Sequence, residues 1–177
     1  MISKPTTAVG TDGRSEAVAQ RLQDLLNPWK MRLYFLSKLP SAWFWRLRVE
    51  SCTESACTVS IPYGWRTQNP FRSTYFAALS GAAELSTGLL ALLALTGRGR
   101  VSMLITDLEA QFVKKADTRT FFTCEEGDAL QAAVQTAIDS GEAQTVSVRS
   151  TGRNTAGEIV CELQLTWSFK QKRAISS

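Results

Sequence analysis

The sequence contains no histidine among its 177 residues. This absence excludes the Ser-His and Cys-His pairs of nucleophilic hydrolases, and it removes the usual ligand sets of hydrolytic zinc. Dehydratases and isomerases that depend on a catalytic histidine are disfavoured for the same reason.

Cysteine is scarce, and its spacing matches no metal-binding motif. Cys52 and Cys57 are separated by four residues, and Cys124 and Cys161 lie inside predicted strands. We therefore expect reduced cysteines in a core, with no bound metal and no cofactor. The stretch 1–16 is polar and lacks the apolar region of a signal peptide, so we expect a cytoplasmic protein.

The chain also lacks a long run of charge of one sign. It carries 20 Lys and Arg against 16 Asp and Glu, a net charge of +4, and its cations are scattered. Such a distribution does not indicate nucleic-acid binding. A ligand with several phosphates would be bound by four of these cations if the fold gathered them: Arg98, Arg100, Lys114 and Lys115.

The length and the 44% content of hydrophobic residues indicate one domain with a single core. There is no internal repeat or low-complexity tract. We expect a loose tail over residues 1–14, helices over 15–45, a main domain over 46–170 and a second tail over 171–177. Asn27-Pro28 is typical of an N-cap followed by proline at the first helical position, which predicts two helices before Pro40.

Alternating apolar and polar residues predict an antiparallel meander with one buried face. The sequence is therefore of the α+β class, with one amphipathic helix at 128–140 inserted among the later strands. The expected strands are 46–50, 57–61, 101–113, 118–124, 143–150 and 158–169.

The most informative segment runs from Asn69 to Leu95 and predicts one long apolar helix entered through an Asn-Pro turn. Glu84 is its only charge after Ser73. Burying a carboxylate on an apolar helix costs several kcal/mol unless the group is paired, hydrogen-bonded or protonated. Glu84 is therefore the leading candidate for a functional residue.

Small residues surround Glu84 on its own face of this helix, at i±3, i±4 and i±7. They form a shallow trough that would admit a thin ligand or another backbone: Ala77, Ser80, Gly81, Thr87, Gly88 and Ala91. A dimer-packing stripe is an equally good interpretation. A transmembrane helix is a weaker one, because of the central carboxylate, the hydroxyl residues and the strand-rich surroundings.

A strand-rich chain with a single fully apolar helix suggests a sheet that curls around this helix. An open sheet has edges that must be covered or paired, so we expect pairing between two copies.

Residues 46–170 resemble the hotdog-fold acyl-CoA thioesterase superfamily, in which a curved antiparallel sheet wraps a central helix. Glu84 follows Asn69 by the fifteen residues that separate the family's asparagine and acid. The run Pro62-Tyr-x-x-Arg-x-x-Asn69 and the ending Ala-Ala-Glu84 are similar to an uncharacterised branch. The segments 112–116 and 165–170 resemble the family's middle and last strands.

The resemblance implies an acyl-CoA thioesterase with sites at a homodimer interface, and a tetramer formed from two such dimers is the alternative assembly. Glu84 would act as base or nucleophile, the Phe76 N–H would bind the oxyanion, and Asn69 of the partner subunit would orient the reactants. Tyr75 stands where many members have a histidine, and Phe76 and Ala77 replace two glycines. Thr106 is the nearest candidate for a hydroxyl facing the acid.

The substrate would lie along Ser80, Gly81, Thr87 and Gly88, and its acyl chain would run toward the aromatic residues 43–45. The alternative interpretation of these three aromatics is ordinary packing of the core. The alternative function is that of a non-catalytic fatty-acyl or lipid-binding hotdog protein, favoured by Tyr75, Phe76 and the absent histidine.

Overall fold

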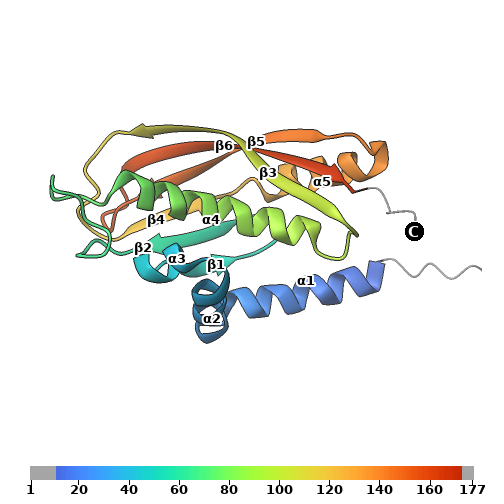
Figure 1. Cartoon of the computed structure of the whole chain (residues 1–177), viewed down its shortest axis with the longest axis horizontal. Helices are drawn as coiled ribbons and strands as arrows, with labels where there is room; N and C mark the ends of the chain where they lie inside the picture. The colour runs from blue at the N-terminus through green and yellow to red at the C-terminus, as the bar shows by residue number, and fades with distance from the viewer. Residues whose placement is uncertain (1–10, 173–177) are drawn as a thin grey trace, which may run out of the picture.

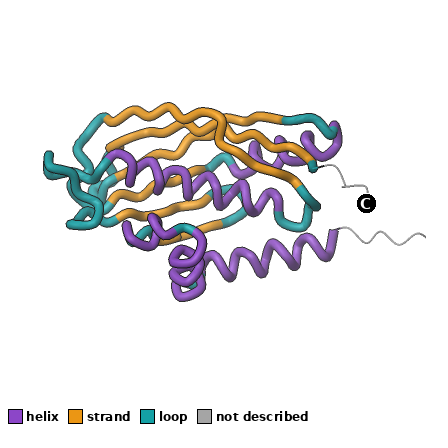
Figure 2. Tube along the Cα trace, in the orientation of Figure 1, coloured by secondary structure: helices purple, strands orange, loops and turns teal. Residues whose placement is uncertain are grey.

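A computed structural model describes residues 11–172 of the chain. Six strands form one antiparallel sheet in the order β1-β2-β4-β5-β6-β3, and the sheet curves around a central helix (Figures 1 and 2). This is the expected hotdog arrangement, with a helical extension at its N-terminal side. The strands are β1 (Arg48–Cys52), β2 (Cys57–Ile61), β3 (Val101–Phe112), β4 (Thr120–Cys124), β5 (Gln144–Arg153) and β6 (Ile159–Gln171).

The central helix α4 (Phe76–Leu95) lies across one face of the sheet, beside α5 (Gly127–Ser140). It contains no proline, and leucine and alanine, both strong helix formers, make up most of it. Its leucines are buried against the inward residues of the strands, among them Phe122 and Leu165. Within residues 11–172, α4 is the one helix long and apolar enough to cross a membrane, but 72% of that stretch is buried inside the fold.

Three helices precede the sheet: α1 (Thr11–Leu26), α2 (Pro28–Lys38) and α3 (Pro40–Trp45). The side chain of Asn27 accepts hydrogen bonds from the N–H groups of Trp29 and Lys30, which confirms the predicted N-cap. Helix α3 ends at Arg46, which adopts a left-handed conformation with φ of 60°. Residues 11–14 begin α1, so the expectation of a loose tail there is wrong. The remaining tail residues, 1–10 and 173–177, lie outside the described residues.

Most predicted elements are confirmed, with shifts at their ends. Strand β5 continues to Arg153 and β6 to Gln171, whereas α4 begins at Phe76 after a loop rather than at Asn69. All four cysteines are free and buried. Burial raises the pKa of Cys124 to about 11 and that of Cys161 to about 12, so both remain neutral thiols within the core.

The two edges of the sheet differ in their cover. Helix α1 packs beside β1, whereas the other edge strand, β3, has its main contacts within residues 11–172 with β6. Leu108 is paired with Leu165 of β6 and shares its inward face, yet it is 44% exposed because α4 packs mainly on β2, β4 and β5. Phe112, also inward, is similarly exposed. An apolar strip along β3 is thus left without a neighbour.

Candidate functional site

The loop before α4 is fixed by hydrogen bonds at both ends. The buried hydroxyl of Thr67 donates to the carbonyl of Pro62 at 2.7 Å, and the Thr67 carbonyl accepts from the N–H of Tyr75 at 2.7 Å. Thr74 donates from both its N–H and its hydroxyl to the carbonyl of Ala116, at 2.8 and 2.9 Å. The start of α4 is therefore held against the segment that follows β3.

Asn69 organises the tip of this loop. Its amide oxygen accepts from the N–H groups of Phe71 at 2.9 Å and Ser73 at 3.2 Å, and its amide nitrogen lies 3.1 Å from the Ser73 hydroxyl. One amide hydrogen remains free for a ligand. The role of Asn69 in orienting substrate stays a prediction, because within one chain its side chain mainly holds the loop.

The first turn of α4 presents two unused donors. Tyr75 is the N-cap residue but makes no side-chain capping bond. Within residues 11–172 the N–H groups of Phe76 and Ala77 have no acceptor. Such groups carry the positive end of the helix dipole and favour a negative charge. The rings of Tyr75 and Phe76 lie beside them, 4.9 Å apart and exposed.

Glu84 lies two turns further along α4 and is partly buried. Its carboxylate has no hydrogen-bond or ion-pair partner within the described chain. Burial raises the pKa of Glu84 above its ordinary value, because the charged form loses hydration. A carboxylate of this kind is a stronger base than an exposed one, and perturbed groups of this type are concentrated at functional sites.

The predicted trough of small residues is real, but two tryptophans of the same chain occupy parts of it. A Cβ atom added to Gly81 would lie 2.7 Å from the ring of Trp45. A Cβ on Gly88 would lie 3.5 Å from Oε1 of Glu84 and equally close to the ring of Trp167. The carboxylate of Glu84 therefore leans over Gly88, toward the C-terminal end of α4.

Thr87 is buried and its hydroxyl is fully engaged. It accepts from Nε1 of Trp167 at 3.1 Å and donates to the carbonyl of Glu84 at 3.0 Å. Gly88 is also buried. The structure thus places these two predicted substrate contacts inside the core, whereas Ser80 and Gly81 remain partly accessible. The hydroxyl of Ser80 donates to the Phe76 carbonyl at 2.9 Å.

The distance between the free N–H groups and the carboxylate limits what one chain can do. Phe76 and Glu84 are eight residues apart, or about 12 Å along the helix axis. With the carboxylate directed toward Gly88, the two groups of one chain do not meet on a single carbonyl.

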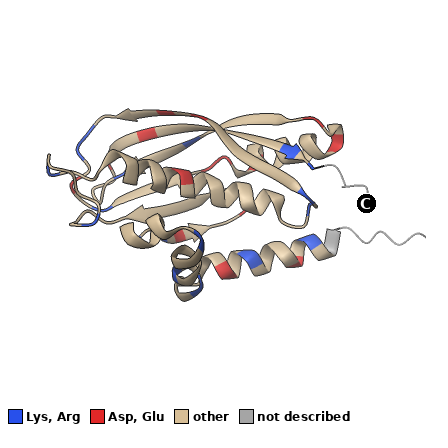
Figure 3. Ribbon diagram, viewed as in Figure 1, with Lys and Arg blue, Asp and Glu red and all other residues tan. Residues whose placement is uncertain are grey.

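The four predicted phosphate-binding cations are not gathered. Arg98 and Arg100 follow the C-terminal end of α4. The guanidinium of Arg98 donates to the carbonyl of Gln131 at 3.0 Å. Lys115 donates to the carbonyl of Phe71 near the other end, and Lys114 pairs with Glu158 at 2.7 Å. A helix of 20 residues, about 30 Å long, separates the two pairs, so this expectation is wrong for one chain. Basic residues accordingly lie at both ends of the molecule (Figure 3).

Thr106 lies on the exposed edge strand β3, at the irregularity between Ile105 and Asp107, and its hydroxyl donates to the Thr166 carbonyl at 3.3 Å. It forms no contact with Glu84 that the structure records. Sequence reasoning missed Trp167 beside Glu84, and it placed Trp45 only among the aromatics of residues 43–45 toward which an acyl chain would run. The alternation of β6 places Trp167 on the buried face, but nothing in the sequence matches it with Gly88.

The comparisons with known proteins agree with this architecture. The model of a family described as a domain of unknown function, DUF4442, matches residues 29–169. No curated protein matches the sequence. A Pseudomonas aeruginosa protein of unknown function, named a probable thioesterase, superposes with a TM-score of 0.68 at 16% identity, over 84% of this chain and 99% of its own.

Two further structures are similar. A thioesterase of Haemophilus influenzae has a TM-score of 0.56 at 13% identity, over 78% of this chain and 88% of its own. A variant of a thioesterase from Pseudomonas aeruginosa has a TM-score of 0.60 at 15% identity, over 80% and 92%. At these sequence identities the structural likeness establishes the hotdog fold and nothing further. The DUF4442 family model, which matches most of the chain, establishes the family. The chain belongs to the DUF4442 family, a domain of unknown function, and it has the hotdog fold.

Proposed function

We propose that the protein hydrolyses an acyl thioester, with acyl-CoA as the substrate class and Glu84 as the base or nucleophile. The observation that carries the proposal is the carboxylate of Glu84, which is partly buried and unpartnered on the central helix of a hotdog fold. The free N–H groups at the start of α4 supply the second element that acyl transfer needs, a site for the oxyanion.

In the simplest course Glu84 removes a proton from a water molecule as the water attacks the thioester carbonyl carbon. The carbonyl oxygen becomes negative and accepts hydrogen bonds from the Phe76 and Ala77 N–H groups. Collapse of this intermediate breaks the carbon–sulfur bond, and the thiolate takes up the proton held by Glu84. In the alternative course Glu84 attacks the carbonyl itself, and water then hydrolyses the resulting anhydride.

The proposed site combines two subunits. The helix start and the carboxylate of one chain are about 12 Å apart along the axis, so the N–H groups and Asn69 would come from the partner of the chain that supplies Glu84. The uncovered apolar strip on β3 supports such a dimer, because an exposed edge strand of twelve residues is a template for pairing. The four free cysteines fit the reducing cytoplasm in which we place the protein.

The primary test is release of free thiol from acyl-CoAs of increasing chain length. We expect turnover by the wild-type protein and loss of at least about a hundredfold in Glu84→Gln, the usual effect of removing a general base. Glu142→Gln, an equivalent change at an exposed position, is the matched control. Equal turnover by wild type and by a folded Glu84→Gln would remove Glu84 from the mechanism.

A second test separates the oxyanion site from the aromatic side chain. Phe76→Pro removes the backbone N–H together with the aromatic ring. Proline is well tolerated at the first position of a helix, and the residue before it, Tyr75, already has the extended backbone that proline requires, with ψ of 133°. Phe76→Ala removes the ring but keeps the N–H. We expect Phe76→Pro to lower kcat by about a hundredfold relative to Phe76→Ala.

The same variants test the shared site. If each site takes Glu84 from one subunit and the helix start from the other, mixed dimers of Glu84→Gln and Phe76→Pro contain one intact site. Random mixing in equal amounts should then restore about a quarter of wild-type activity, by simple statistics of a two-fold dimer. Mixtures as inactive as the two parents would place both groups in one subunit or disprove the dimer.

The alternative, an acyl-binding protein without turnover, is favoured by one observation. Trp45 fills the space above Gly81, which narrows the trough in front of Glu84. Thiol release from no substrate, together with calorimetric binding of a long-chain acyl-CoA, would establish that alternative.

A further inference from the structure

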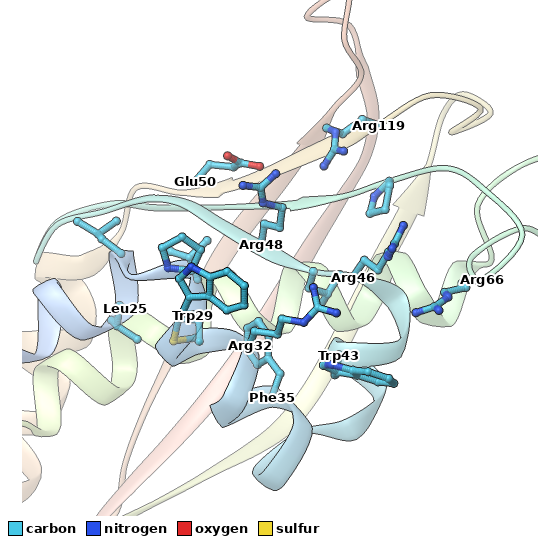
Figure 4. A pocket seen from close by; sticks show the side chains of 16 residues that line it. Leu25, Trp29, Arg32, Phe35, Trp43, Arg46, Arg48, Glu50, Arg66 and Arg119 are labelled. Carbon is cyan, nitrogen blue, oxygen red and sulfur yellow. The ribbon is translucent and has the colours of Figure 1, made fainter.

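A cavity of about 660 Å³ lies outside the Glu84 region, between the N-terminal helices and the first strands (Figure 4). Its walls come from the end of α1, from α2 and α3, from β1, and from the loops after β2 and before β4. No residue of α4 lines it. Its volume falls in the range of pockets that hold cofactors and other small ligands.

The polar side of this cavity is strongly basic. It is lined by Arg32, Arg46, Arg48, Arg66 and Arg119, and by one carboxylate, that of Glu50. None of the five arginines forms an ion pair with a carboxylate within residues 11–172. Glu50 instead accepts a hydrogen bond from the buried hydroxyl of Ser60.

Two of the arginines are oriented by neutral groups. Arg119 donates to the Ser60 hydroxyl at 3.1 Å, and the guanidinium of Arg66 lies 5.9 Å from the ring centre of Trp43 and 5.4 Å from that of Phe44. These contacts position the side chains and leave five guanidinium groups against the single carboxylate of Glu50. Five like charges around one cavity repel one another and attract a multiply charged anion.

The rest of the lining is apolar. The lining residues Met31, Phe35 and Leu47 are buried, whereas Trp29, also in the lining, is 77% exposed. An indole so exposed beside a basic cavity is suited to an apolar chain or ring that extends past the anionic group. The cavity therefore offers both guanidinium groups and apolar surface to one ligand.

We infer that this cavity is a binding site for an amphiphile that carries phosphate groups, separate from the site proposed around Glu84. Arginine is suited to phosphate because its planar fork donates two parallel hydrogen bonds. A ligand with a single carboxylate would leave most of the positive charge unbalanced. Two sources share this chemistry: a phosphorylated nucleotide cofactor with a thiol arm, such as coenzyme A, and a lipid with a phosphate headgroup.

The test is isothermal titration calorimetry of the full chain with three probes: coenzyme A, a short-chain lysophosphatidic acid and decanoate. The test variant is Arg32→Gln/Arg48→Gln, whose two arginines have exposed side chains and no ion pair. The control is Arg149→Gln/Arg153→Gln on β5, which removes the same charge outside the cavity. Circular dichroism and the unfolding midpoint confirm that both variants fold.

We expect at least one phosphate probe to bind wild type and the control within about twofold, and the test variant at least about tenfold more weakly. Binding of coenzyme A alone would identify a phosphorylated cofactor, and binding of the lysophosphatidic acid alone a lipid phosphate. The inference is overturned if neither phosphate probe binds, if decanoate binds as tightly, or if the test variant binds the phosphate probes as tightly as the control variant does.

Discussion

Gly81 and Gly88 lie one turn before and one turn after Glu84, and the structure predicts opposite effects when each is replaced by alanine. Alanine is favoured over glycine inside a helix by about 1 kcal/mol. At Gly88 the new methyl group would meet its nearest neighbours at 3.5 Å, an ordinary contact distance. Gly88→Ala should therefore keep most of the helical gain and stabilise the protein by about 0.5–1 kcal/mol.

At Gly81 the same methyl group would lie 2.7 Å from Cζ3 of Trp45, closer than two carbon atoms can approach. The indole is rigid and partly buried, so the ring or α3 must move, which typically costs about 1–3 kcal/mol. Subtracting the helical gain leaves Gly81→Ala destabilised by up to about 2 kcal/mol. The two variants should thus differ by about 0.5–3 kcal/mol, although their substitutions are chemically identical.

Urea unfolding at one protein concentration measures both variants, and Trp45→Phe supplies the check. The smaller ring lacks the clashing atom, so Gly81→Ala should cost less in the Trp45→Phe background than in wild type, in a double-mutant cycle. If Gly81→Ala and Gly88→Ala stabilise the protein equally, Trp45 does not pack on Gly81, and the trough in front of Glu84 is open.

Three further predictions concern Glu84, a buried hydroxyl pair and the edge strand. The pKa of Glu84 is raised in the folded state, so the stability that this side chain contributes falls as pH rises from its ordinary pKa of 4.5 to the raised value. Glu84→Gln should therefore unfold at a higher urea concentration than wild type at pH 8 but not at pH 4. Equal urea midpoints of the two proteins at both pH values would contradict this. Ser86→Ala leaves the buried Ser150 hydroxyl, 2.7 Å away, without its partner and should lower the free energy of unfolding by about 1–3 kcal/mol, measured by thermal unfolding. The double alanine variant should lose less stability than the sum of the two single variants, and simple additivity would show that the pair is uncoupled. Leu108→Glu should shift the proposed dimer to monomer in sedimentation velocity, and an unchanged sedimentation coefficient would move the interface away from β3.

The fold could be predicted from sequence because its signals are local and agree with one another. Alternation along the strands and the uninterrupted apolar run of α4 each identify an element without knowledge of its neighbours. The start of α4 was placed too early because the Asn-Pro turn resembles a helix start. Only the hydrogen bonds of Thr67 and Thr74 to distant carbonyls show that the chain remains in a loop up to Tyr75.

The site was only partly predictable, because its surroundings come from distant segments. Glu84 was identified from its isolation among apolar residues, and the structure confirms that it is partly buried and without a partner. The positions of Trp45 and Trp167 above the two glycines depend on how α3 and β6 pack against α4. The basic cavity likewise gathers arginines separated by up to 87 positions in the sequence, Arg32 and Arg119 among them.

Three unsatisfied features of the single chain are best explained together. Within residues 11–172 the carboxylate of Glu84 has no partner, the first N–H groups of α4 have no acceptor, and the inward side chains of Leu108 and Phe112 on β3 are exposed. The first and the third of these features are connected through Trp167, whose ring lies beside Gly88 and whose backbone pairs directly with Ile105 of β3. A second copy along β3 would cover the apolar strip and bring its own helix start toward Glu84. In a monomer each of these three features would need a separate explanation. The oligomeric state and the complementation of Glu84→Gln by Phe76→Pro therefore both test whether a second copy completes the site.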